Sequence, residues 1–189
     1  MPTPGRTSLP EIVAAGALIL ETQGAAGLTM QAVADRVGVR APSLYKHVRD
    51  RDALLALVAT ATSDELARRL AGAGESLETI AHTYRAFAHE RPEGFRLLLS
   101  ADAEVEVEAL ARASAPVLRV AGELVGRDDA LEAARLVTAW ATGFIHMELA
   151  GAFRLQGDLE SAFEYGLARL SVALSPAGEG GSASSGALD

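Results

Sequence analysis

Apolar residues recur at helical spacing along most of this chain, and no useful stretch alternates apolar and polar positions as a strand would. The pattern therefore predicts an all-α protein. Caps and breakers separate the apolar stretches, so we expect helices at about 8–24, 30–37, 42–48, 51–71, 76–90, 92–99, 104–124, 128–153 and 158–174.

Two short apolar blocks near the N-terminus are separated by a tight joint. In the first block, Val33, Ala34 and Val37 form a narrow apolar stripe of helical period. Gly38 follows and ends the helix, because a residue without Cβ takes the left-handed conformation at no steric cost. Pro42 suits the first turn of the next helix, where its missing N–H would have had no partner. The pattern predicts a helix-turn-helix.

The second helix of this pair, at about 42–48, directs Leu44 and Val48 toward the first helix and leaves its polar groups outward. These groups are Ser43, Tyr45, Lys46 and His47. A hydroxyl, a phenol, an ammonium and an imidazole suit phosphate oxygens and base edges in a major groove. Thr29 is a plausible cap that would place the N-terminus of the preceding helix against a phosphate. The alternative is a helical hairpin with a solvated polar face, since such pairs also occur outside DNA-binding proteins.

The same stretch resembles a known family. Thr29-Met30 through Ala34, Gly38-Val39, Pro42 to Tyr45, His47-Val48 and Asp52 to Leu55 are similar to the DNA-binding domain of the TetR (tetracycline repressor) family, over about residues 8–70. The resemblance implies a homodimeric transcriptional regulator, with an N-terminal operator-binding domain and a larger helical domain that carries an effector pocket and the dimer interface. The predicted DNA-binding residues are Thr29, Arg40, Ser43, Tyr45, Lys46, His47 and Arg51, of which Tyr45, His47 and Arg51 resemble the family's phosphate contacts.

The elements divide the chain into four parts. Residues 1–7 are expected to form a flexible arm, and Ser8 and Glu11 then give a capping-box signature at the start of the helix-turn-helix domain, 8–55. The helix at about 51–71 connects this domain to a helical bundle, 56–174, for ligand binding and dimerisation. Residues 175–189, rich in Gly, Ser and Ala, are expected to form a disordered tail.

Composition excludes several classes of protein. Of the 189 residues, 49% are hydrophobic, which is enough for a substantial core. The absence of cysteine excludes disulfides, thiolate catalysis and cysteine-ligated zinc. No apolar run approaches the roughly 18 residues of a membrane span, and the N-terminus lacks a secretory apolar segment. We therefore expect a cytoplasmic protein without a membrane partner.

The net charge of −8 first argues against a nucleic-acid partner, but its distribution changes the picture. Residues 1–72 hold eight Lys and Arg against seven Asp and Glu, so the acidic excess lies in the rest of the chain. Only charge near the phosphates strengthens DNA binding. The single lysine, Lys46, falls within the proposed recognition helix.

Histidines and carboxylates give no enzymatic signature. The four histidines are His47, His82, His89 and His146, and neither HExxH nor another metal-ligand spacing surrounds them. His82 and His89 are seven residues apart and could share one face of a helix. The sequence therefore predicts no catalytic residue, no metal and no cofactor. The competing class is an all-α small-molecule-binding or enzymatic protein in which the helix-turn-helix only packs.

The aromatic residues indicate a pocket in the C-terminal part. Eight of the nine lie beyond residue 80. We expect an apolar cavity among Phe87, Phe95, Trp140, Phe144 and Met147, with His82, Thr142 or His146 as polar anchors. Its ligand would be a largely apolar small molecule, neutral or cationic. Ordinary core packing of the same residues is the alternative.

Two further expectations concern the C-terminal helices. The segment from Gly143 to Gly151 resembles a TetR subgroup named for a Trp-His-Gly motif: Gly143, Phe144, Glu148 and Gly151 fit, while Thr142 and Thr138 stand where His and Trp are expected. The helices at 128–153 and 158–174 carry wide apolar stripes, which predict a two-fold four-helix interface and a palindromic operator.

Overall fold

The computed structural model describes residues 7–100 and 104–175, and these residues form helices joined by short loops. In chain order the helices are α1 (Leu9–Gly27), α2 (Met30–Val37), α3 (Ala41–Leu44), α4 (Arg51–Gly72), α5 (Leu77–Glu90), α6 (Pro92–Leu98), α7 (Val107–Val125), α8 (Ala130–Leu149) and α9 (Leu159–Leu174). The predicted all-α class is confirmed. The predicted arm at 1–7 and tail at 175–189 lie outside the described residues except for one residue each.

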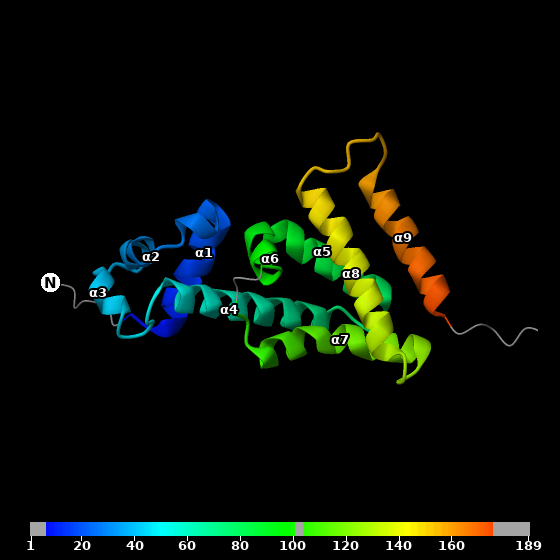
Figure 1. Cartoon of the computed structure of the whole chain (residues 1–189), viewed down its shortest axis with the longest axis horizontal. Helices are drawn as coiled ribbons and strands as arrows, with labels where there is room; N and C mark the ends of the chain where they lie inside the picture. Colours follow the sequence, from blue (N-terminus) through cyan, green and yellow to red (C-terminus); the bar gives the residue numbers. More distant parts are fainter. Residues whose placement is uncertain (1–6, 101–103, 176–189) are drawn as a thin grey trace, which may run out of the picture.

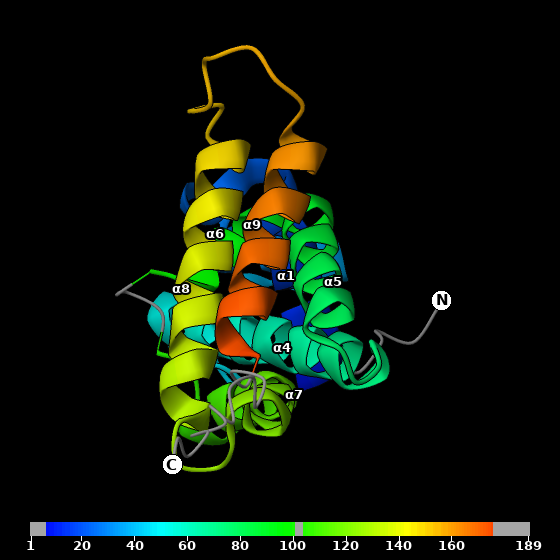
Figure 2. The same ribbon diagram turned by 90° about the vertical axis from the view of Figure 1, so that its right-hand side faces the viewer.

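The helices form two groups along α4 (Figure 1). At one end, α1 packs on α4, α2 packs on α1, and α3 packs on α2. At the other end, α7 lies along α4, and α5, α8 and α9 stand across it. Figure 2 shows α9 between α8 and α5, the two helices that it packs against. None of the helices in the described part of the chain is long and apolar enough to cross a membrane.

Each group has its own apolar core, and α4 contributes to both. The first core takes Leu54 and Val58 from α4 and buries them against α1, α2 and α3. The second core takes Leu66 and Leu70 from the later turns of the same helix and packs them against helices α5 to α9. One continuous helix therefore supplies a wall of each core.

The capping residues at the helix N-termini form the hydrogen bonds that the sequence predicts. The Ser8 N–H donates to Glu11 Oε2 at 2.8 Å, and the Glu11 N–H donates to Ser8 Oγ at 3.4 Å, which completes the capping box of α1. Asp50 caps α4 by accepting the Ala53 N–H at 2.8 Å. These bonds satisfy N–H groups that have no partner inside the helix.

Two predicted boundaries are wrong. The helix expected at 128–153 ends at Leu149, because the chain turns at Gly151 with φ of 62° and leaves Phe153 in the following loop. The helix expected at 42–48 is shorter still. Only Ala41–Leu44 is α-helical, and residues 45–47 form a turn in which the His47 N–H bonds the Leu44 carbonyl three residues back.

Candidate functional site

The first helix of the helix-turn-helix is fixed at both ends by its own sequence. Thr29 Oγ1 accepts the Ala32 N–H at 3.1 Å and caps α2. At the other end Gly38 adopts φ of 74°, and the Val39 N–H reaches back to the Ala34 carbonyl at 3.0 Å. The cap uses the acceptor side of the Thr29 hydroxyl, so its hydrogen remains free to be donated to a phosphate.

The turn after α3 is held in place by two buried side chains, one leucine and one valine. Leu44 and Val48 are both buried in the first core with Val33 and Ala34 of α2. The Val48 N–H bonds the Leu44 carbonyl at 2.9 Å, which keeps the chain wound past the end of α3. The residues between these two anchors are therefore turned away from the core.

Those outward residues carry the polar groups that the sequence indicates. Tyr45 is 55% exposed, Lys46 and His47 are exposed, and Ser43 is half-buried. Arg40, just before α3, is exposed as well. Neither Arg40 nor Lys46 forms an ion pair with any residue that the structure describes, so both charges are available to a phosphate or a base edge.

Arg51 has a structural role that sequence reasoning missed. Its Nε donates to the Leu28 carbonyl at 2.9 Å, and one terminal nitrogen donates to the Ala25 carbonyl at 2.6 Å. The guanidinium thereby ties the first turn of α4 to the last turn of α1 and to Leu28, which follows it. A DNA contact by Arg51 stays a prediction, and its main observed partners are these two carbonyl groups.

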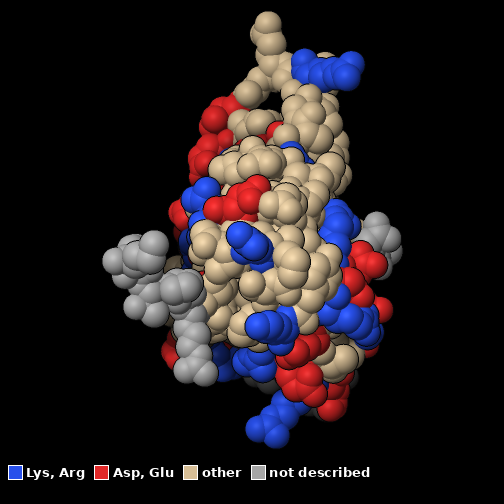
Figure 3. All heavy atoms as spheres, turned by 90° about the vertical axis from the view of Figure 1, so that its left-hand side faces the viewer, with Lys and Arg blue, Asp and Glu red and all other residues tan. Residues whose placement is uncertain are grey.

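The charge on this end of the molecule is mixed. Figure 3 looks onto the end that carries α1 to α3 and shows Lys and Arg side chains spread over the face with Asp and Glu side chains between them. Arg49, for example, is paired with Asp50 at 2.6 Å. The cations without an acidic partner are therefore the ones that give this face its attraction for phosphate.

An apolar cavity of about 200 Å³ lies in the second group of helices. Its walls come from α4 to α8, and its polar groups are the hydroxyls of Ser63, Tyr84, Ser114 and Thr138. Ser63 is 1% exposed and donates to the Ala109 carbonyl at 3.2 Å. Among the residues that the structure describes, no charged side chain lines this cavity.

The cavity is not where the sequence placed it. None of the eight predicted ligand residues lines it. Phe87 and Phe95 are fully buried in the second core, and Trp140 and Phe144 pack on Phe163 of α9 at ring-centroid distances of 5.1 and 5.3 Å. The rings of Trp140, Phe144 and Phe163 thus fill the space between α8 and α9 with one another.

The predicted polar anchors are likewise engaged elsewhere. His82 Nε2 lies 2.7 Å from Glu164 Oε1, while His146 and Met147 are exposed on α8. Thr142 lies next to the cavity and shares a hydrogen bond of 3.0 Å with the Tyr84 hydroxyl. Burial raises the pKa of Tyr84, and the bond to Thr142 opposes part of that rise.

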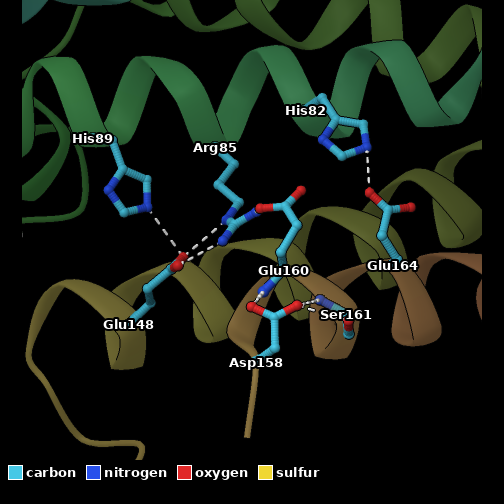
Figure 4. Close-up of polar contacts among 8 residues, drawn as sticks. All are labelled: His82, Arg85, His89, Glu148, Asp158, Glu160, Ser161 and Glu164. Atoms are coloured by element: carbon cyan, nitrogen blue, oxygen red, sulfur yellow. Dashed lines mark hydrogen bonds and ion pairs between the residues drawn. The ribbon is translucent and has the colours of Figure 1, made fainter.

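Sequence reasoning also missed an ion-pair network on α5. Arg85 binds Glu148 of α8 through two bonds of 2.9 and 2.6 Å and Glu160 of α9 at 2.5 Å (Figure 4). His89 lies 3.1 Å from the same Glu148. The spacing of His82, Arg85 and His89 on one helical face was the available signal, but their partners come from two other helices.

A larger open cleft of about 1060 Å³ lies where the two groups of helices meet. It is lined by side chains of both signs, including Arg51, Arg96, Glu93 and Glu106. Such a lining suits solvent rather than an apolar ligand.

Comparison with known proteins decides the family. Residues 6–58 match the family described as bacterial regulatory proteins, tetR family, and residues 77–170 match the tetracyclin repressor-like C-terminal domain. The chain belongs to the TetR family of transcriptional regulators. Its N-terminal helices α1 to α3, called the DNA-binding head below, and its C-terminal helices are those of a TetR regulator. TetR regulators bind DNA and are, in general, not enzymes.

Individual relatives agree with this assignment. The chain is 29% identical over 159 residues to the uncharacterized HTH-type transcriptional regulator Rv0681 of Mycobacterium tuberculosis, covering 78% of this chain and 73% of that protein. The crystal structure of the regulatory protein SCO4313 superposes with a TM-score of 0.72 at 25% identity, covering 85% of this TetR chain and 93% of the other. A Rhodococcus protein of unknown function shares the fold with a TM-score of 0.77 at 22% identity, over 93% and 100% of the two chains.

Proposed function

We propose that this TetR-family regulator is a cytoplasmic homodimeric repressor that binds a palindromic operator and is released by a small, neutral, largely apolar effector. One observation supports the proposed release by an effector: α4 is shared between the DNA-binding head and the wall of the cavity. Ser63, Leu66 and Leu70 line the cavity, while Leu54 and Val58 of the same helix lie in the core of the head.

The proposed DNA surface comprises the exposed groups around α2 and α3. The hydroxyl of Thr29 and the N-terminus of α2 would meet one phosphate. Ser43 and Lys46 would reach base edges or phosphate, with Arg40, Tyr45 and His47 on the backbone at either side. Arg51 would act mainly by holding α4 against the end of α1 and Leu28, which fixes the arrangement of the helices in the head.

The proposed dimer forms through the outer faces of α8 and α9. These helices lie side by side at the end of the molecule that Figure 2 faces, away from α2 and α3. The large apolar side chains that remain exposed on them include Leu136, Met147, Tyr165 and Val172. A second copy that covers this face with its own identical face would bury all four and create the two-fold axis that a palindromic operator needs.

The proposed effector is defined by the lining of the cavity. Its walls are leucine, isoleucine, valine and alanine side chains, and hydroxyls such as those of Ser63 and Tyr84 offer the polar contacts. The cationic ligand considered from the sequence has no support here, because none of the described side chains around the cavity is a carboxylate. At about 200 Å³ the cavity suits a ligand smaller than a drug-sized molecule, since the pockets of drug-sized ligands measure about 300–1,000 Å³.

Release from DNA requires only that the effector bind one tilt of α4 more tightly than another. A ligand between α4 and α7 that pushes the later turns of α4 outward would swing both heads of the dimer. The α3 helices of the two heads, each with its turn at residues 45–47, would then no longer match successive major grooves about 34 Å apart.

The test is to select bound fragments from a random DNA pool with the purified protein and to sequence them. We expect an enriched palindrome, protection of both half-sites, and a dimer by light scattering at micromolar concentration. Enrichment of a single half-site, or a monomer in solution, would contradict the proposed assembly. Adding small neutral apolar compounds to the protein–operator complex then tests release.

A further inference from the structure

We propose that Glu78, His82 and Glu164 form a binding site for a divalent transition-metal ion of the Zn²⁺ class on the surface between α5 and α9. Each of the three side chains offers one ligand atom, and these atoms all lie within 4.8 Å of one another. The site is separate from the cavity and from the DNA-binding head.

The fold brings the three groups together from two helices. Glu78 and His82 are one helical turn apart on α5 and therefore share a face. Glu164 comes from α9, directly after Phe163, whose buried ring anchors that turn of the helix. Figure 4 shows His82 and Glu164 directed toward one another, with Nε2 and Oε1 at 2.7 Å.

The imidazole is already oriented for ligation. The Phe163 ring meets the His82 ring edge-on at a centroid distance of 5.7 Å and an interplanar angle of 63°. This contact restricts rotation of the imidazole and keeps Nε2 on the Glu164 side. A ligand held in one orientation loses less conformational freedom when it binds a metal.

The donor set indicates the class of ion. One imidazole nitrogen and two carboxylate oxygens are typical ligands of Zn²⁺, which binds such atoms at about 2.0–2.2 Å and leaves a fourth position for water. Ca²⁺ and Mg²⁺ prefer oxygen ligands alone, so the histidine disfavours them. On binding, the metal takes the place of the proton between His82 and Glu164, and the two carboxylates compensate its charge.

The second histidine of the same helix face has no equivalent site. His89 lies 3.1 Å from Glu148, but Arg85 holds that carboxylate through two bonds. The guanidinium supplies the positive charge that a metal would bring, and it would repel an added cation. His89 is therefore a matched control for His82: the same residue on the same helix, also paired with a glutamate.

A metal at this site would join α9 to α5. Glu164 is on the side of α9 that faces α5, whereas Tyr165, the next residue, is exposed on another side. The metal site and the proposed dimer face can thus exist together. Because the ion would bind the folded arrangement and not the unfolded chain, it would raise the melting temperature.

The first test uses the full chain, free of affinity tags and stripped of metal. Calorimetric titration with ZnCl₂ should show one ion per chain. Titration with CoCl₂ or CuCl₂ should quench Trp140, the only tryptophan, because it stacks on Phe163 at 5.1 Å and Phe163 contacts His82. We expect His82→Ala and Glu164→Gln each to weaken binding by about tenfold or more, a loss typical of disturbed metal sites.

The controls separate this site from adventitious binding. His89→Ala should bind the metal as the wild type does, and Glu164→Gln should abolish the rise in melting temperature with ZnCl₂. If His82→Ala alters the helix content by circular dichroism, Glu164→Gln and Glu78→Gln decide the question. No binding at millimolar metal, or equal losses in His82→Ala and His89→Ala, would overturn the proposal.

Discussion

The carboxylate of Glu21 in α1 accepts the backbone N–H of Gly94 at the start of α6, at 2.9 Å. Its other oxygen accepts the Glu93 N–H at 3.2 Å. A Cβ added at Gly94 would lie 2.9 Å from this carboxylate and 3.0 Å from the Thr62 methyl group of α4. The DNA-binding head therefore meets the second domain at a joint where α1, α4 and α6 come together without spare room, in addition to the continuous α4.

Replacing Glu21 tests this joint. Glu21→Ala leaves two N–H groups at the start of α6 without their acceptor, so we expect the free energy of unfolding to fall by about 1–3 kcal/mol. Urea denaturation measures the loss. The control is Glu75→Ala, since Glu75 is exposed and its contact with Arg119 at 3.6 Å should contribute little. An equal free energy of unfolding in the two variants would show that the Glu21 hydrogen bonds do not stabilise the fold.

Lys46 tests the proposed DNA surface. Lys46 is exposed and has no partner among the described residues, so Lys46→Ala should weaken operator binding without lowering the melting temperature. If Lys46 contacts a phosphate, the slope of log affinity against log salt concentration should decrease by about 0.9. If it contacts a guanine edge, specificity should instead relax at one base pair, as a binding-site selection would reveal.

Two further variants serve as comparisons for Lys46→Ala. Arg68→Ala removes an exposed charge from α4 away from the head and should leave operator binding unchanged. Arg51→Ala should lower both affinity and stability, because it also breaks the bonds to the Leu28 and Ala25 carbonyls. An affinity for operator that is unchanged in Lys46→Ala would contradict the role assigned to this residue.

Filling the cavity should uncouple the effector from DNA. Ala113 lines the cavity and is half-buried, so Ala113→Leu would occupy part of its volume with three added carbons. We expect operator affinity to remain within about threefold of the wild type, because the cavity has room for the added carbons and the core is not overpacked. Release by the effector should be lost, as measured by fluorescence anisotropy of labelled operator. Normal release from this variant would place the effector elsewhere.

The network around Arg85 predicts how stability depends on pH. The Arg85 guanidinium lowers the pKa of Glu148 below its ordinary value of 4.5, and the hydrogen bond from His89 adds to this effect. A carboxylate with a lowered pKa in the folded state stabilises the fold above its unfolded pKa, and this contribution is lost as the pH falls. The wild type should therefore lose stability more steeply below about pH 4.5 than Glu148→Gln does, in denaturation curves recorded from pH 6 to pH 3. Parallel curves would show that Glu148 does not contribute.

What could be predicted from the sequence was local. Ser8 with Glu11, Thr29 with Ala32, and Asp50 with Ala53 are pairs three residues apart, so a short stretch of sequence determines each cap and the start of each helix. Gly38 ends α2 for an equally local reason. Together these signals and the helical period were sufficient for the all-α class, the head and the connecting helix, and the match to the TetR family extends that agreement to function.

Only the tertiary structure decided which helices meet. The sequence placed Trp140 and Phe144 around an apolar cavity, but it did not show that both rings pack on Phe163 of α9. For the same reason the cavity lies among aliphatic side chains of α4 to α8, and Glu164 completes a cluster with His82 that no spacing along the chain reveals. Helical periodicity specifies which face of a helix is buried, whereas the partner of that face depends on crossing angles and side-chain volumes distributed over the entire chain.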